Sequence, residues 1–255
     1  MKAIRAISER VRDAGGRAFV VGGWVRDMLL DRPSKDVDIE VFGLDPAVLK
    51  SLLRRMGRVS TVGESFTVYK VWVDGHEGDI DVSIPRRESK TGRGHRGFTV
   101  VGDPSMSVEE AARRRDFTIN AILFDPLSGE YVDPFNGRGD LDGRVLRAVD
   151  PETFVEDSLR VLRAAQFAAR FALSLEPRTV ALCRVIPLDD LPSERIWGEI
   201  DKLLVRAHEP SRGLEALCEL GVLPKLFPEL EALVGCPQDP EHHPEGDVWT
   251  HTRCV

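Results

Sequence analysis

Two pairs of aspartates, each separated by one apolar residue, have the clearest chemical potential in this sequence. Asp36 and Asp38 flank Val37, and Asp79 and Asp81 repeat the pattern further along the chain. Alternate residues of a strand point to one face, so each pair projects two carboxylates together. Adjacent hard oxygen ligands suit Mg²⁺. If the two strands are neighbours, Asp81 or Asp79 can complete a two-metal cluster that activates a hydroxyl and stabilises a leaving phosphate.

A glycine pair just upstream offers a place for that phosphate. Gly22 and Gly23 end an apolar segment and precede a short helical segment. Such a turn exposes backbone N–H groups at a helix N-terminus, which favours anions. Arg26 lies one turn into the helix and could reach the same phosphate or pair with Asp27. Aspartates, glycines and arginine together are far more specific than any of them alone.

The elements that must position these groups form a mixed α/β or α+β region in the first half of the chain. Apolar residues at helical spacing, such as Ile4, Ile7 and Val11, indicate helices, and short apolar or alternating segments indicate strands. The helices expected here are 1–14, 24–30, 46–56 and 108–114; the strands are 18–21, 37–41, 59–62, 67–73, 79–84, 121–124 and 130–132.

The second half of the chain has helical patterns only. We expect one long helix over 152–170, then helices over 178–185, 193–205, 210–220 and 228–234. The tail from Cys236 to Val255 carries three prolines and resembles the start of a further, incomplete module.

Composition and charge exclude several classes of protein. The chain has 255 residues, of which 42% are hydrophobic and 30% charged, and no apolar run approaches the roughly 20 residues needed to span a bilayer. The charged start is not a signal peptide, so we expect a cytoplasmic protein without a membrane partner. Four widely spaced cysteines without a CxxC pair indicate reduced thiols. The net charge of −7 argues mildly against a general nucleic-acid binder, but basic residues cluster locally.

Three blocks of sequence resemble the signatures of class II CCA-adding enzymes and bacterial poly(A) polymerases, in the order and spacing of that family. They are VGGWVRD at 21–27 with KDVDI at 35–39, RRDFTINA at 114–121, and EDSLRVLR at 156–163. A weaker fourth block comprises Glu194, Arg195, Ile196, Glu199 and Lys202.

The resemblance implies an α+β fold, with a nucleotidyltransferase head similar to that of polymerase β, built on a mixed sheet, and an all-helical neck and body. We expect the head over 1–149, the neck for base recognition and RNA binding over 150–235, and the start of an incomplete HD-type segment over 236–255. The implied site has metal ligands Asp36 and Asp38 and nucleotide-binding residues Gly22, Gly23, Arg26 and Arg115, together with Asp157, Arg160 and Arg163 in the neck. The second aspartate pair adds Asp81 as the expected third catalytic carboxylate.

The chemistry of the neck motif agrees with that implication. Asp157, Arg160 and Arg163 fall near one stripe of the expected helix. Aspartate only accepts hydrogen bonds and arginine only donates. Adenine and cytosine both present an amino donor beside a ring-nitrogen acceptor, whereas guanine and uracil present the reverse and would leave buried groups unpaired. The plain alternative is a surface ion pair.

Three features depart from the family pattern or extend it. Many relatives carry a third arginine where this chain has Gln166, which puts one nucleotide or phosphate contact in doubt. The segment 86–98 matches a flexible loop linked to the switch from C to A addition, and its basic residues are RNA-binding candidates: Arg86, Arg87, Lys90, Arg93 and Arg96. His251 resembles a first metal ligand of HD-type phosphohydrolases, but the downstream His-Asp pair is absent, so we expect no such activity.

The function we expect is template-independent addition of CMP and AMP from CTP and ATP to the 3′ end of tRNA, with Mg²⁺ as cofactor. Full CCA addition, addition of A only and poly(A) synthesis share every motif, whereas the loop over 86–98 argues slightly against the further alternative, addition of CC only. A non-catalytic RNA-binding fragment is a second alternative, favoured by the short C-terminal region. A nucleotidyltransferase acting on small molecules or proteins is a third, disfavoured by the neck motif. The sequence leaves the oligomeric state open.

Overall fold

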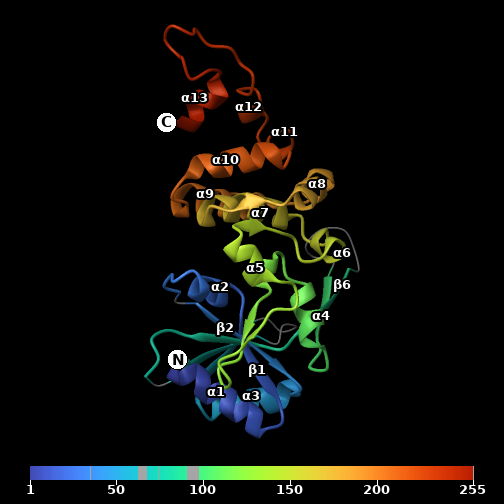
Figure 1. Ribbon diagram of the computed structural model, residues 1–255. Helices are drawn as coiled ribbons and strands as arrows, with labels where there is room; N and C mark the ends of the chain where they lie inside the picture. The colour runs from blue at the N-terminus through green and yellow to red at the C-terminus, as the bar shows by residue number, and fades with distance from the viewer. Residues whose placement is uncertain (35, 63–67, 74, 91–97, 255) are drawn as a thin grey trace. The chain divides into compact units, whose positions relative to one another are not determined.

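The computed structural model describes residues 1–34, 36–62, 68–73, 75–90 and 98–254, without the side chains of 62, 88–90 and 98–100. The chain divides into two compact units, Met1–Gly139 and Asp140–Val255 (Figure 1). No helix among the described residues is long and apolar enough to cross a membrane.

Unit 1 is built on a mixed seven-stranded sheet with the order β3-β4-β5-β2-β1-β8-β9. All neighbouring strands are antiparallel except β2 and β5, which are parallel. The strands are β1 (Arg17–Val21), β2 (Val37–Phe42), β3 (Gly57–Val62), β4 (Val68–Val73), β5 (Ile80–Ser83), β8 (Leu123–Phe124) and β9 (Tyr131–Val132). The predicted mixed sheet is confirmed.

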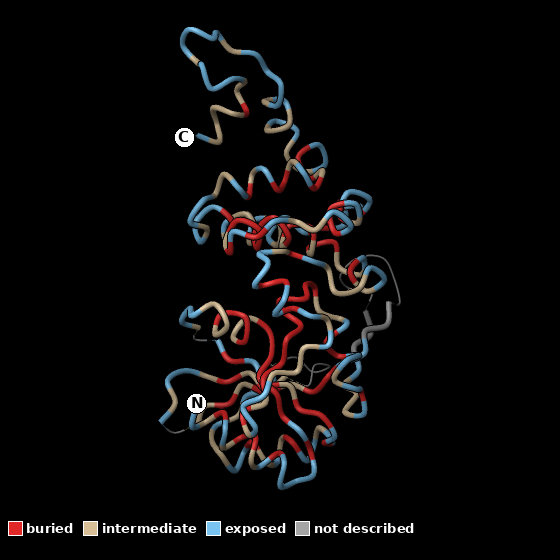
Figure 2. The backbone as a smooth tube through the Cα atoms, in the orientation of Figure 1, coloured by how far each residue is buried: buried red, intermediate tan, exposed pale blue. Residues whose placement is uncertain are grey.

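The helices of unit 1 cover the sheet through apolar faces. Ile4, Ile7 and Val11 are buried on α1, as the helical spacing predicts, and α1 contacts β1 and α3. Buried segments fill the middle of the sheet (Figure 2). The helices are α1 (Lys2–Asp13), α2 (Gly23–Leu29), α3 (Pro46–Arg54), α4 (Val108–Arg113) and the short 3₁₀ turn η1 (Thr118–Asn120).

A separate two-stranded sheet flanks the segment predicted as a basic loop. Its strands are β6 (Arg86–Lys90) and β7 (Phe98–Gly102). The segment expected to be a loop over 86–98 therefore begins with a strand, whose backbone pairs with β7 from Arg86 opposite Gly102 to Lys90 opposite Phe98. The remainder of that loop, 91–97, lies outside the described residues.

Unit 2 is helical apart from a short parallel pair of strands, β10 (Val145–Leu146) and β11 (Ser174–Leu175). Helix α7 is its centre: ten of its thirteen residues are buried, and it contacts α9 and α10. The helices are α5 (Gly137–Asp142), which begins in unit 1, α6 (Pro151–Phe154), α7 (Leu159–Phe171), α8 (Pro177–Val185), α9 (Ser193–Arg206), α10 (Pro210–Glu219), α11 (Leu223–Leu226), α12 (Pro228–Glu231) and α13 (Val248–Cys254).

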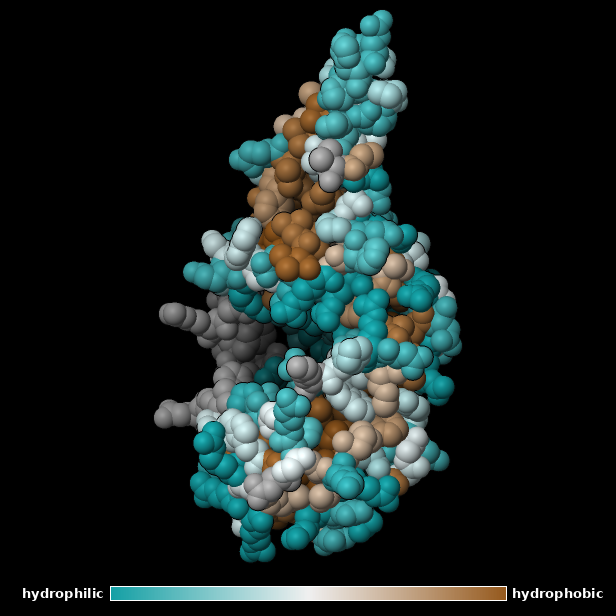
Figure 3. All heavy atoms as spheres, turned by 90° about the vertical axis from the view of Figure 1, so that its left-hand side faces the viewer, coloured by the Kyte–Doolittle hydropathy of each residue, from teal (hydrophilic) through white to brown (hydrophobic). Residues whose placement is uncertain are grey.

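A glycine lets two of these helices approach closely. A Cβ atom at Gly213 of α10 would lie only 2.5 Å from Cγ of Leu203 on α9. Apolar side chains also remain on the surface of this unit: Trp197 and Val205 of α9 are 64% and 73% exposed. Figure 3 shows brown, hydrophobic surface gathered on the helical unit.

The single long helix predicted over 152–170 is wrong, because the chain breaks between α6 and α7. Asp157 accepts a hydrogen bond from the Leu159 amide at 3.1 Å, and Ser158 donates to Asp190 at 2.8 Å. Side chains that bond locally to the backbone compete with helix continuation. Arg160 then donates to the carbonyl of Thr153 at 2.8 Å, which satisfies an acceptor at the end of α6.

Candidate nucleotidyltransferase site

Strand β2 presents the predicted carboxylates on one face. Val37, Ile39 and Val41 are buried, whereas Asp38 is exposed. Asp36, just before the strand, is exposed as well. The predicted alternation is therefore confirmed: the valine between the aspartates enters the core and the two carboxylates face outward.

The parallel pairing of β2 with β5 brings the second aspartate pair to the first. Asp38 lies opposite Asp81 in the register, so both side chains stand on the same face of neighbouring strands. The sequence left Asp79 and Asp81 open as the third carboxylate. The register favours Asp81, because Asp79 precedes the strand.

A lysine that the sequence patterns did not single out joins this acidic group. Lys70 on β4 lies opposite Asp81, and its Nζ is 3.0 Å from Oδ1 of Asp81 and 2.5 Å from Oδ2 of Asp79. These bonds raise the pKa of Lys70 and lower the pKa of Asp79. Only the pairing of β4 with β5 identifies Lys70, since nothing in its local sequence marks it.

The surroundings of Asp38 disfavour its charged form. Removal from water by the surrounding protein atoms raises its pKa, although part of the side chain stays exposed, and repulsion from Asp81 and Asp36 adds to the effect. Arg115 and Lys70 oppose the shift. Oxygen donors that repel one another and remain reachable from solvent fit a hard divalent cation such as Mg²⁺.

The glycine turn passes directly beside these carboxylates. Gly22 has φ +71°, a conformation that side chains rarely adopt. A Cβ atom there would lie 3.3 Å from Nη1 of Arg115 and 3.8 Å from Oδ2 of Asp38. Arg115 also pairs with Glu40 of β2 at 3.3 Å. The turn, Asp38 and Arg115 therefore form one constellation, as their sequence motifs predict.

Arg26 pairs with Asp27, one of the two partners that its position in the sequence suggests. Its guanidinium is buried, with bonds to Oδ1 of Asp27 at 2.9 and 2.7 Å and to Oδ1 of Asn120 at 2.7 Å. Asn120 in turn donates to Asp116 at 2.9 Å. Of the two partners that the sequence left open, pairing with Asp27 is confirmed, and the phosphate contact stays a prediction. Arg26 thereby joins α2 to η1, and so joins the first sequence block to the second.

The neck residues do not share one helix face. Asp157 precedes α7, where its carboxylate pairs with Arg195 of α9 at 3.2 Å. Arg160 and Arg163 lie on α7, with their guanidinium carbons 5.9 and 4.9 Å from the ring centroids of Phe154 and Phe167. The predicted stripe is therefore wrong for Asp157, because the helix begins two residues after it.

Gln166 points to the interior of unit 2. It is 1% exposed, and its Nε2 is buried without a hydrogen-bond partner among the described atoms. An arginine at this position would place a charge in the same surroundings, which is unfavourable without a partner. The sequence could not show this, because burial here results from the packing of α7 against α9 and α10.

Two of the five basic RNA-binding candidates can be placed. Arg86 and Arg87 begin β6, and Arg87 donates to Asp103 at 2.6 Å and lies 3.8 Å from Glu110. The Lys90 side chain, together with Arg93 and Arg96, lies outside the described residues.

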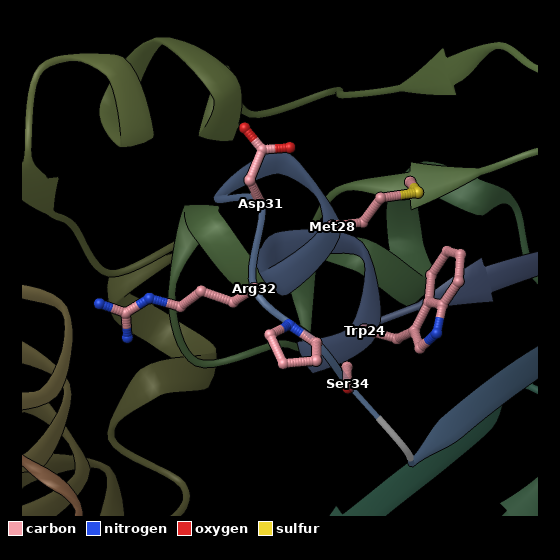
Figure 4. A pocket seen from close by; sticks show the side chains of 6 residues that line it. Trp24, Met28, Asp31, Arg32 and Ser34 are labelled. Carbon is pink, nitrogen blue, oxygen red and sulfur yellow. The ribbon is translucent and has the colours of Figure 1, made fainter.

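A pocket of 390 Å³ that no sequence motif indicated lies along α2 and the loop that leads to β2 (Figure 4). Trp24 and Met28 line it from the helix, and Asp31, Arg32, Pro33 and Ser34 from the loop. The Trp24 ring packs against Phe124 with 6.3 Å between ring centroids. An aromatic ring and an arginine are the types of side chain on which unpaired bases stack.

Comparison with known proteins places this geometry in a family. Residues 18–147 match the poly(A) polymerase head domain, and residues 173–233 match a second family described as a probable RNA- and SrmB-binding site of polymerase A.

Named relatives extend the comparison. Over 246 residues the chain is 45% identical to the multifunctional CCA proteins of Xanthomonas campestris pv. campestris (strain B100) and Stenotrophomonas maltophilia (strain R551-3), covering 94% of this chain but 57% and 58% of those proteins. The chain thus spans a little over half their length.

Solved structures give the same result. The Bacillus stearothermophilus CCA-adding enzyme in complex with CTP matches with a TM-score of 0.74 and 31% identity over 87% of this chain and 52% of that one. The Thermotoga maritima CCA-adding enzyme complexed with tRNA matches with a TM-score of 0.73 and 25% identity over 96% and 55%. The head-domain match over residues 18–147 covers just over half of the chain and includes the glycine turn and both aspartate strands, and this protein therefore belongs to the class II CCA-adding enzyme and poly(A) polymerase family.

Proposed function

We propose that this protein adds CMP and AMP from CTP and ATP to the 3′ end of tRNA without a nucleic-acid template. The RNA 3′-hydroxyl attacks the α-phosphate of the nucleotide, and pyrophosphate leaves. The observation that carries the proposal is the parallel register of β2 and β5, which sets Asp38 beside Asp81.

Asp36, Asp38 and Asp81 are the proposed Mg²⁺ ligands. Their donors are carboxylate oxygens, and a shared cation offsets both the burial that raises the Asp38 pKa and the added repulsion from Asp81 and Asp36. Bound Mg²⁺ supplies charge neutralisation for the attacking and leaving oxygens. Lys70 holds Asp81 and Asp79 on the side of β4 and so fixes the orientation of the Asp81 carboxylate.

Gly22, Gly23 and Arg115 are the proposed triphosphate contacts. The absence of side chains at the turn allows close approach of a phosphate to the backbone, and Nε of Arg115 is buried without a hydrogen-bond partner among the described atoms. A donor of that kind can bind a phosphate oxygen strongly. Arg26 donates hydrogen bonds to Asp27 and Asn120, and these bonds fix the helix that follows the glycine turn.

Asp157, Arg160 and Arg163 are the proposed base-recognition residues. Asp157 accepts from the exocyclic amino group of cytosine or adenine, and Arg160 donates to the adjacent ring nitrogen. Arg195 pairs with the Asp157 carboxylate at 3.2 Å and so fixes the position of this acceptor. Uracil and guanine present the reverse pattern and are rejected.

The acceptor is proposed to be the 3′ end of tRNA. Two solved relatives are complexes with CTP and with tRNA, and the second family match is described as an RNA-binding site. The pocket beside Trp24 and Arg32 offers a place for an unpaired base. The basic residues of 86–96 are proposed to contact the RNA backbone. We also propose that the protein is cytoplasmic.

Primer extension tests this function. The purified protein is incubated with Mg²⁺, tRNAs that end before CCA, after one C or after both Cs, and each nucleoside triphosphate alone or a CTP and ATP mixture. Addition of two Cs and one A followed by arrest supports CCA addition. AMP added only to the last substrate indicates an A-adding enzyme, arrest after CC a CC-adding enzyme, and a long A-tail a poly(A) polymerase.

A non-catalytic RNA-binding protein is the second candidate, because residues 173–233 match a family described as a probable RNA- and SrmB-binding site of polymerase A. It predicts tRNA binding without extension of any primer. The intact carboxylate constellation argues against it.

A further inference from the structure

The face of the sheet that carries the aspartates continues past them onto β4 and β3. Asp38 of β2 lies opposite Asp81 of β5, and Asp81 lies opposite Lys70 of β4. Residues opposite one another in a sheet share a face, and so do alternate residues of one strand. Trp72, which follows Lys70 by two residues on β4, therefore stands on the same face as the carboxylates. One ligand can reach both from the same side of the sheet.

The opposite face of β4 packs against the helices of unit 1. Tyr69 and Val71 of this strand are buried. The Tyr69 hydroxyl donates to the carbonyl of Pro46 in α3 at 3.1 Å. Trp72 has the opposite orientation and stays partly exposed. Its ring therefore lies outside the core that α3 and β4 enclose.

An arginine lies over the Trp72 ring. Arg58 of β3 is opposite Trp72 in the register, and its guanidinium carbon is 4.3 Å from the ring centroid. Arg58 is exposed, and no described carboxylate forms an ion pair with it. Aromatic rings and guanidinium planes are the surfaces on which unpaired bases of RNA stack, and a guanidinium also binds phosphate. Arg58 and Trp72 combine both kinds of contact in one place.

The position of this pair suits the acceptor strand of the reaction. Trp72 is the diagonal neighbour of Asp81 across β4 and β5, and such neighbours are about 7–8 Å apart. Successive stacked bases of one strand are about 3.4 Å apart. A base on the pair therefore lies within the last few nucleotides before a hydroxyl that reacts at the carboxylates. Lys70, paired with Asp79 and Asp81, offsets negative charge that repels RNA along this path.

We propose that Arg58 and Trp72 form a stacking platform for an unpaired nucleotide near the 3′ end of the acceptor RNA. The proposal rests on the proposed function, because the attacking hydroxyl must belong to RNA. The base of the incoming nucleotide has its own partners in Asp157 and Arg160, which leaves the platform to the acceptor. Stacking tolerates every base, since each has a π-face. That tolerance fits an acceptor whose terminal nucleotide changes with each addition.

Filter binding of tRNA that ends after both Cs, with Mg²⁺ and without nucleoside triphosphate, tests the platform. Trp72→Leu removes the ring, and we expect the affinity to fall about 5–150-fold, the range typical for loss of the stacking partner of one base. Trp72→Phe keeps an aromatic face and should retain most of the affinity. Arg58→Ala should weaken binding, whereas Arg17→Ala should not. Arg17 is the matched control, because it lies over the Phe19 ring of the same sheet at 4.8 Å.

Changes in the RNA locate the stacked base. Each of the last nucleotides is replaced in turn by an abasic one. At one position this replacement should weaken binding to the unmodified protein and cost nothing further with Trp72→Leu, because the two changes remove the same contact.

Primer extension separates failure of the platform from failure of the proposed function. Trp72→Leu should raise KM for tRNA and leave KM for CTP unchanged. If this variant, folded by circular dichroism, binds and extends tRNA as the unmodified protein does, the platform is wrong and the function stands. A raised KM for CTP alone, or no saturable tRNA binding by the unmodified protein, would also overturn the platform. Loss of tRNA affinity in Trp72→Leu, when the unmodified protein extends no primer, would support the platform and contradict nucleotide addition.

Discussion

Asp38 of unit 1 is placed favourably for metal binding but unfavourably for the stability of the fold. Asp38 lies close to Asp36 and Asp81, and Arg115 and Lys70 offset part of that repulsion. Charges of one sign held together without full compensation destabilise the folded state, and such arrangements are common where a ligand supplies the missing charge. The carboxylates are therefore expected to matter for activity and to reduce stability at the same time.

Substitution of Asp38 should abolish primer extension. Asp38→Ala removes a proposed metal ligand on the face shared with Asp81, and we expect the extension rate to fall on the order of 10³-fold. Single-turnover extension of a tRNA lacking CCA measures the effect. Asp13→Ala, at the exposed end of α1, is the matched control. A loss smaller than about tenfold would contradict the role of Asp38 as a ligand.

The same position predicts a pH-dependent gain in stability. The folded-state pKa of Asp38 lies above its ordinary value, so the ionised carboxylate destabilises the fold once the pH exceeds the unfolded-state pKa. Asp38→Asn removes that penalty. We expect a higher Tm than the unmodified protein at neutral pH in chelator, and a difference that disappears as the pH falls below both pKa values. Thermal unfolding by circular dichroism across this pH range tests it, and a lower Tm at neutral pH would contradict it.

Arg26 should contribute mainly to the stability of the folded protein. Its side chain is 5% exposed beside Asp27 at 10%, and removal of one partner of a buried ion pair costs about 3–5 kcal/mol. Arg26→Ala should therefore lower the free energy of unfolding in urea by that amount, whereas the exposed Arg54→Ala should have little effect. A variant with unchanged stability and weakened nucleotide binding would instead support the direct phosphate contact that the sequence suggested.

At the scale of elements, the start of α7 is decided by competition between side chains and backbone. Asp157 bonds the Leu159 amide and Arg195, while Arg160 bonds the Thr153 carbonyl. These bonds replace the turn that would have joined α6 to α7. Asp157 and Arg160 therefore lie at the start of α7, and Asp157 is held by its ion pair with Arg195 of α9.

Loss of that acid should relax nucleotide choice. Asp157→Ala removes the proposed acceptor for the amino group, and we expect the preference for CTP and ATP over UTP and GTP to fall about 10–100-fold. Arg195→Ala should produce a smaller change in the same direction. Ratios of kcat/KM for the four nucleotides measure both, with Arg206→Ala at the exposed end of α9 as control. Unchanged ratios with folded Asp157→Ala would exclude the residue from base recognition.

For the whole molecule, the net charge is negative while one local segment is strongly basic. The protein carries −7 overall, yet basic residues cluster at 86–96. Binding of RNA by such a protein depends on a few local phosphate contacts, since the remainder of the surface repels the backbone.

Salt dependence of tRNA binding should reveal those contacts. The logarithm of the affinity should fall linearly with the logarithm of salt concentration, and each lost phosphate contact should reduce the slope by about 0.7–0.9. Arg93→Ala with Arg96→Ala should reduce it by up to two such steps, while Arg5→Ala with Arg12→Ala on α1 should leave it unchanged. Filter binding over a range of salt measures the slopes. Equal slopes for all variants would show that this segment does not touch RNA.

The sequence by itself determined most of the local structure and the identity of the family. Alternation around Val37 predicted the outward face of β2, the stripe of Ile4, Ile7 and Val11 predicted α1, and the glycine turn predicted the start of α2. These patterns depend on neighbours in the chain, which the periodicity of a strand or a helix already fixes.

Only the tertiary structure decided which distant residues meet. The parallel pairing of β2 with β5 selected Asp81, and the pairing of β4 with β5 added Lys70. Arg26 donates a hydrogen bond to Asn120 of η1, and Asp157 forms an ion pair with Arg195 of α9. Such contacts depend on strand order and helix packing. Local propensity carries no information about either, because the free energy that selects them comes from burial across the whole unit.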